Sequence, residues 1–125
     1  MPGPIVFIVC EDAPVRQSVR ALVESTGLQA TTFPTLQAFL DAKEPGSGGC
    51  LVFQPENNTL DDPAQQGRLA TACTGRRGIL IIERGNVPAT VLALKAGIRD
   101  VVQKPYRDKE LLERIEKVLE GNATV

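Results

Sequence analysis

The chain has 125 residues, a formal net charge of −1, and 42% hydrophobic and 23% charged residues. This composition is typical of one globular domain, and it gives no electrostatic reason to expect binding to nucleic acid or to an anionic membrane. Three widely spaced cysteines and the lack of histidine argue against a zinc site or a disulfide framework. No signal peptide and no apolar run near the ~20 residues of a membrane span is visible. We therefore expect a single domain over residues 1–125 in the cytoplasm.

Strand and helix signals alternate through the first half of the chain. In order, they predict a strand at 5–9, a helix from an Asp12 cap to Gly27, a more exposed strand at 28–33, a short Thr35-capped helix through Leu40, and a strand at 50–54. The last strand follows a flexible stretch at 43–49. It ends at Pro55, because proline has no N–H to donate to a strand ladder.

The alternation continues through the second half. In order, it predicts a helix at about 64–73, a turn at 75–78, a strand at 79–82, a helix from Pro88 to Gly97, a strand at 100–103, and a last helix from an Asp108 cap to Gly121. Alternating strands and helices predict an α/β protein with a parallel sheet and right-handed crossovers. At this length we expect the flavodoxin-like (βα)5 three-layer sandwich, with five strands in the order 2-1-3-4-5.

The carboxyl ends of the first, third, fourth and fifth strands converge in that topology, and ligands of open α/β sheets bind there. The residues at or just after these ends would surround one shallow pocket. They are Cys10, Glu11, Asp12, Gln54, Ile82 and Lys104.

This set of positions resembles the phosphorylation site of the receiver domains of two-component response regulators, and the resemblance covers about residues 5–120. It is greatest for receivers of the nitrogen-fixation-regulator type, which carry LuxR-type DNA-binding output domains. Residues 85–88, 94–97 and 104–106 carry that resemblance. The family implies two acidic residues after the first strand that hold Mg²⁺, and an aspartate after the third strand that accepts the phosphoryl group. It also implies a threonine or serine after the fourth strand and a lysine after the fifth.

The chain departs from this pattern. Cys10 and Glu11 stand at the two acidic positions, and Gln54 stands at the acceptor position. Ile82 stands at the hydroxyl position and Lys104 at the lysine position. The family's aromatic switch position holds Val101. The amide of Gln54 forms no acyl phosphate, and Ile82 cannot hydrogen-bond a phosphoryl oxygen. Glu11 is acidic but one methylene longer than aspartate, so only Lys104 stands as the family has it. We therefore interpret the chain as a pseudo-receiver, which is not an enzyme and uses no metal or cofactor.

Several local interpretations remain open at this point. Gln54 either hydrogen-bonds Lys104 or fills the site and meets water, and Lys104 is expected to form an ion pair with Glu11. Cys10 is either a redox-sensitive thiol or, as we favour, a small buried structural residue. Three loop carboxylates are either substitute phosphoacceptors or, as we favour, simply solvated; these are Glu56, Asp61 and Asp62.

The resemblance also implies a contact face, formed by the fourth and fifth helices and the fifth strand, that serves dimers or output domains. The residues expected there are Val91, Leu94, Lys95, Val101, Arg107, Lys109, Glu110 and Arg114. Their mixed charges suit a polar-rimmed homodimer interface. An output domain would lie beyond Val125 or on another chain.

Two further functions are alternatives to the phosphorylation-independent regulator. The first is a small-molecule sensor with its ligand in the vacated pocket, which Ile82, Val101 and Phe53 would make apolar. The second is a receiver with an unconventional phosphoacceptor.

Overall fold

The computed structural model describes residues 5–42, 49–55, 62–74, 76–85, 87–98 and 100–123. Its five strands form one parallel sheet in the order β2-β1-β3-β4-β5, as expected from the sequence. The strands are β1 (Ile5–Cys10), β2 (Gln29–Phe33), β3 (Cys50–Gln54), β4 (Arg77–Glu83) and β5 (Asp100–Lys104).

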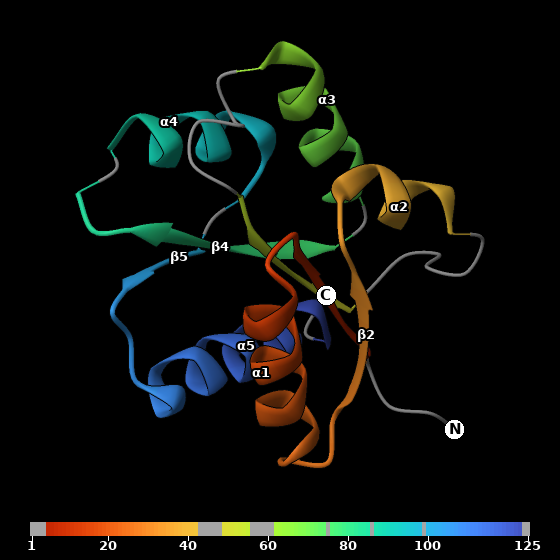
Figure 1. Ribbon diagram of the computed structural model, residues 1–125, viewed down its shortest axis with the longest axis vertical. Coiled ribbons are helices and arrows are strands. Elements are labelled where there is room, and N and C mark those ends of the chain that lie inside the picture. The colour runs from red at the N-terminus through yellow and green to blue at the C-terminus, as the bar shows by residue number, and fades with distance from the viewer. Residues whose placement is uncertain are drawn as a thin grey trace.

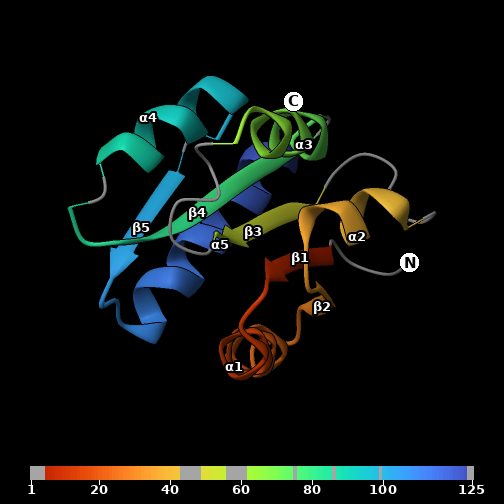
Figure 2. The same cartoon turned by 45° about the horizontal axis from the view of Figure 1, so that its top comes forward.

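Helices cover both faces of the sheet and make the expected three layers. They are α1 (Ala13–Glu24), α2 (Leu36–Asp41), α3 (Pro63–Ala72), α4 (Val87–Ala96) and α5 (Asp108–Ala123). Figure 1 shows α2, α3 and α4 above the sheet and α1 and α5 below it, and the tilted view in Figure 2 shows the same separation. None of the helices described is long and apolar enough to cross a membrane.

The two faces of the sheet bury separate apolar clusters, because successive side chains of a strand point to opposite faces. Phe53 and Leu80 pack under α2, α3 and α4, whereas Val52 and Ile81 pack against α1 and α5. Both faces being buried explains why these strands are continuous apolar runs. Gln54, two residues after Val52, therefore lies on the same face of the sheet as α1 and α5.

Two of the predicted helix caps are confirmed. The Asp12 carboxylate accepts a hydrogen bond from the backbone N–H of Val15 at 3.2 Å, and the Thr35 hydroxyl accepts one from the N–H of Ala38 at 3.0 Å. Each cap satisfies a backbone donor that the first turn of a helix leaves unpaired. The Asp12 cap matters for function because it uses a carboxylate beside the site.

The last helix differs from the prediction at both ends. Asp108 is the first residue of α5 and not its cap, since the carbonyl of Arg107 accepts the Leu111 N–H at 3.3 Å. At the other end α5 continues through Gly121 to Ala123. A glycine costs only about 1 kcal/mol in a helix, so it does not by itself end one.

Strand β4 begins earlier than predicted. Arg77 pairs in register with Cys50, so residues 77 and 78 of the expected turn belong to the strand. Gly78 is suited to this place by its missing side chain: a Cβ there would lie 3.1 Å from Cγ1 of Ile98. The predicted flexible stretch 43–49, apart from Gly49, and the loop carboxylates Glu56 and Asp61 lie outside the described residues.

Candidate functional site

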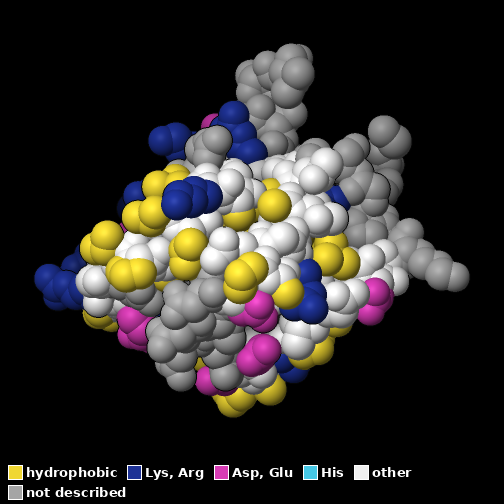
Figure 3. Space-filling view, turned by 90° about the horizontal axis from the view of Figure 1, so that it is seen from above, with side chains coloured by type: hydrophobic (Ala, Val, Ile, Leu, Met, Phe, Trp, Pro, Cys, Tyr) yellow, Lys and Arg dark blue, Asp and Glu magenta, His cyan; other side chains and the backbone are white. Residues whose placement is uncertain are grey.

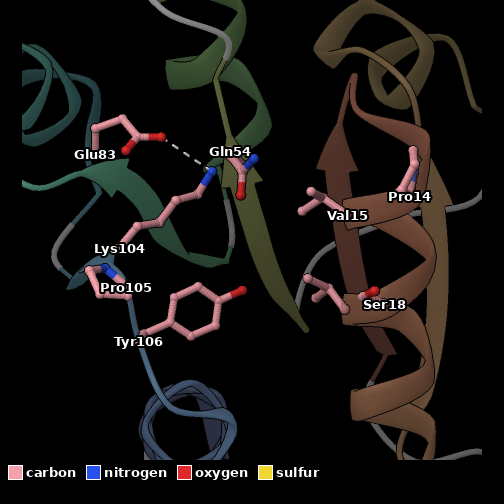
Figure 4. A pocket seen from close by; sticks show the side chains of 9 residues that line it. Pro14, Val15, Ser18, Gln54, Glu83, Lys104, Pro105 and Tyr106 are labelled. Atoms are coloured by element: carbon pink, nitrogen blue, oxygen red, sulfur yellow. Dashed lines mark hydrogen bonds and ion pairs between the residues drawn. The ribbon is translucent and has the colours of Figure 1, made fainter.

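The carboxyl ends of β1, β3, β4 and β5 lie at one edge of the sheet and bring some of the predicted site positions close together. Cys10 is the register partner of Gln54, and Glu83 is the register partner of Lys104. Figure 4 shows the side chains of Gln54, Glu83 and Lys104 close to one another. The described residues at this edge therefore form a site with a thiol, an amide, a carboxylate and an amine.

Gln54 contributes a buried oxygen without a partner. Its Oε1 is buried and has no hydrogen bond within the described part of the chain. Of the two interpretations of Gln54, the hydrogen bond from Lys104 to this oxygen is therefore not present. An unsatisfied buried polar group costs about 1–3 kcal/mol, and such groups in folded proteins call for an explanation. The acceptor position thus holds a neutral amide at an energetic cost.

Lys104 forms an ion pair with a residue that the sequence analysis missed. Its Nζ lies 3.5 Å from Oε1 of Glu83, so the expected pair with Glu11 is wrong. The β4–β5 register explains the choice, since Glu83 and Lys104 are direct cross-strand partners, whereas Glu11 lines a small recess beside Thr35. The Glu83 side chain is 74% exposed, so this pair adds only about 0–1 kcal/mol to stability.

Cys10 has the properties of a structural cysteine. It is buried, and its Sγ lies 3.6 Å from the backbone oxygen of Asp12. Burial raises the pKa of the Cys10 thiol and outweighs the lowering influence of that hydrogen bond and of Lys104 and Arg16. A thiol that stays protonated is a poor nucleophile and a poor redox sensor, which favours the structural interpretation.

Arg16 is a second site residue that sequence reasoning missed. Its Nη1 donates a hydrogen bond to the backbone oxygen of Cys10 at 2.7 Å and lies 3.5 Å from that of Glu11. Nothing in the spacing of Arg16 distinguishes it from the other polar residues of α1, such as Gln17 and Arg20. The structure places its guanidinium at the end of β1.

The residues at these strand ends do not fit the Mg²⁺ ion that the family resemblance implies. Mg²⁺ prefers hard oxygen ligands in octahedral geometry. Cys10 offers a protonated thiol, the Asp12 carboxylate caps α1, and Gln54 brings no negative charge. The Arg16 guanidinium adds positive charge beside them. Among the residues described, no three His, Cys, Asp or Glu side chains gather as a metal site.

The hydroxyl and switch positions of the family are apolar and packed. Ile82 is only 3% exposed and belongs to the cluster under α2, α3 and α4, and Val101 packs against that cluster. Phe53 lies in the same cluster. These three side chains therefore do not line the pocket that we expected them to make apolar, since they point to the opposite face from Gln54.

An open cavity of about 650 Å³ lies on the Gln54 face instead. Its apolar walls come from Pro14, Val15 and Val19 of α1 on one side and from Pro105 and Tyr106 on the other. Figure 4 shows Val15 facing Lys104 and Tyr106 across this space, with Gln54 between them. Sequence alone could have placed Gln54 on this face by counting residues along β3, but not the approach of α1.

Of the loop carboxylates, only Asp62 falls in the described chain. Its Oδ1 accepts the backbone N–H of Ala64 at 3.0 Å, so it caps α3. Capping α3 is a sufficient structural role for Asp62, and it does not require that the carboxylate accept a phosphoryl group.

The strand order, the helices on both faces and the similarity to solved structures define the class of fold: this is the flavodoxin-like fold of CheY-like receiver domains. No family model matches the chain. Over 111 residues it is 34% identical to nodulation protein W of Bradyrhizobium diazoefficiens, covering 89% of this chain and 49% of that protein. Over 114 residues it is 32% identical to transcriptional regulatory protein FixJ of the same organism, covering 91% and 56%.

Solved structures agree with these relatives. The crystal structure of FixJ-N is 28% identical, covers 96% of both chains and superposes with a TM-score of 0.80. By their names, the relatives include a transcriptional regulatory protein and a response regulator protein, and the structural neighbours include a response regulator receiver protein that is 28% identical. The chain spans about half the length of the curated relatives that it matches.

Proposed function

We propose that this chain is a pseudo-receiver domain, a receiver of an atypical response regulator that works without phosphorylation. It is a regulatory module and not an enzyme. It acts through protein–protein contact on an output domain, covalently linked or separate, that binds DNA and controls transcription. The whole chain, residues 1–125, forms this one domain, and the domain itself does not contact nucleic acid.

The observation that carries the proposal is the neutral amide of Gln54, with its buried Oε1, at the acceptor position. Phosphoryl transfer needs an ionised oxygen as the nucleophile and cations that neutralise the developing charge. Gln54 lacks the nucleophilic oxygen, and the neighbouring Cys10 thiol stays protonated. Lys104 remains, but a lysine alone supplies no nucleophile for the phosphoryl group.

We expect no phosphorylation of this chain. After incubation with acetyl phosphate and Mg²⁺, intact-mass spectrometry should show no added phosphoryl group, because no carboxylate occupies the acceptor position. Beryllofluoride with Mg²⁺ should likewise leave the melting temperature unchanged. A receiver domain that retains the family aspartate, treated in parallel, serves as the positive control. A phosphoryl adduct on this chain would refute the proposal.

The proposed contact face includes an exposed apolar stripe on α4. Val91 and Leu94 are 44% and 43% exposed, and Val87, which the sequence analysis missed, is 65% exposed. Their spacing of four and three residues places them on one side of the helix. Figure 3 shows hydrophobic side chains gathered over α4, at the left of the view. Such clustering on a surface indicates an interaction site.

Charged side chains would form the rim of this face. Those expected from the sequence are Lys95, Arg107, Lys109, Glu110 and Arg114. Two already make ion pairs within the chain: Lys109 with Glu113 at 3.8 Å, and Arg114 with Asp100 at 3.4 Å. We propose that a second copy of the chain covers the α4–β5–α5 face.

Leu94→Glu is expected to abolish this dimer, because it places a carboxylate in the apolar centre of the interface. Sedimentation velocity over a series of protein concentrations should show the wild type associating and Leu94→Glu staying monomeric. Ala21→Glu, an exposed position on α1, is the matched control and should associate like the wild type. A wild type that stays monomeric at high concentration would contradict the proposed interface.

A further inference from the structure

The cavity beside Gln54 has the size and character of a small-molecule site. Its volume of about 650 Å³ falls within the range of roughly 300–1,000 Å³ that is usual for such sites. Its walls are mainly apolar, formed by α1 and by the segment that follows β5. Binding pockets typically combine such walls with a few well-placed polar groups.

Gln54 Oε1 supplies the polar group that a ligand would recognise. It is buried, lacks a hydrogen-bond partner among the described residues, and is directed toward the space between Val15 and Tyr106 (Figure 4). A ligand donor placed there would remove the cost of leaving this acceptor unsatisfied. Satisfying this acceptor would therefore contribute to the free energy of ligand binding.

Lys104 and Tyr106 add a second polar edge. Among the residues that the structure describes, the Lys104 amine is held by one largely exposed carboxylate, at 3.5 Å, and the Tyr106 hydroxyl points toward the cavity in Figure 4. An acceptor on the ligand could therefore reach Lys104 without breaking a strong ion pair.

We propose that this cavity binds a small, largely apolar molecule that carries a hydrogen-bond donor for Gln54. The apolar body lies between Pro14 and Val15 of α1 and the Pro105–Tyr106 segment. The proposal concerns binding alone, and it holds or fails independently of whether the chain is phosphorylated.

Indole and 1-methylindole are the matched probes for this site, since they share an apolar ring system and only indole has an N–H donor. In ¹H–¹⁵N NMR titrations, indole should shift the amide signals around Val15, Gln54 and Tyr106 in a saturable manner. 1-Methylindole should shift the same signals with a dissociation constant about five- to tenfold larger, the factor expected for one hydrogen bond. Shifts confined to α4, no saturable binding, or equal dissociation constants would each overturn the proposal.

Three variants test the assignment of the residues. Gln54→Leu keeps the shape of the side chain but removes the acceptor, so the ratio of the two dissociation constants should fall to about one. Gln29→Leu, the same change at an exposed position on β2, should keep the wild-type ratio. Ser18→Phe should fill the cavity and abolish binding of both probes, with signal dispersion reporting that the chain is folded. A wild-type ratio in Gln54→Leu, or undiminished binding in folded Ser18→Phe, would place the ligand elsewhere.

Discussion

Replacing Phe39 with alanine is expected to lower the free energy of unfolding by about 3–5 kcal/mol. Phe39 is 1% exposed, and its ring centroid lies 5.3 Å from those of both Phe7 and Phe33. The Arg76 guanidinium carbon lies 5.1 Å from the Phe39 ring centroid, so the truncation also removes a cation–π contact. Urea denaturation followed by circular dichroism measures the loss.

The half-buried Leu40, next along α2, provides the comparison. Leu40→Ala should cost clearly less than Phe39→Ala, because less apolar surface leaves the core. Domains of this size are stable by about 5–15 kcal/mol, so the Phe39 variant should stand close to the limit of folding. A loss below about 1 kcal/mol would show that α2 is not fixed to the sheet through this ring.

Replacing Gln54 with leucine is expected to raise the free energy of unfolding by about 1–3 kcal/mol, in the absence of any ligand. The substitution removes the buried, unpartnered Oε1 and leaves an apolar group of similar volume. Most substitutions destabilise a protein, so a gain in stability at this position would be a distinctive result. The midpoint of urea unfolding measures it.

The exposed Gln29 again gives the matched control, and Gln29→Leu should change the stability by no more than about 0.5 kcal/mol. A destabilised Gln54→Leu variant would mean that the amide is satisfied in solution. That result would remove the energetic argument for a ligand donor at this oxygen.

The fold could be predicted from the sequence because both faces of the sheet are buried. Such strands are continuous apolar runs that end sharply, as at Pro55, and the helices between them carry one apolar side. The helix caps Asp12 and Thr35 could also be predicted, because short polar side chains are typical of N-cap positions. The cap of α5 was not, because Arg107 contributes only its carbonyl, which every residue has.

The site was less predictable because its contacts depend on register and on the approach of α1. Lys104 could be placed at the end of a strand, but its pairing with Glu83 follows from how β4 and β5 align. Arg16 reaches the Cys10 carbonyl from the first turn of α1, so this contact depends on how α1 leaves the sheet. The cavity walls likewise come from α1 and from the segment after β5, and the sequence pattern does not predict how close these two lie to each other.

The dispersal of the altered residues over separate strands bears on the history of the domain. Cys10 belongs to β1, Gln54 to β3 and Ile82 to β4, and Cys10 and Ile82 are both nearly inaccessible to solvent. A carboxylate restored at Cys10 alone, or a hydroxyl at Ile82 alone, would bury a polar group and weaken the fold. Neither change would return any chemistry by itself. Under the proposed function, a return to phosphate signalling would therefore need changes on three separate strands, and the changes at Cys10 and Ile82 would each weaken the fold when made alone.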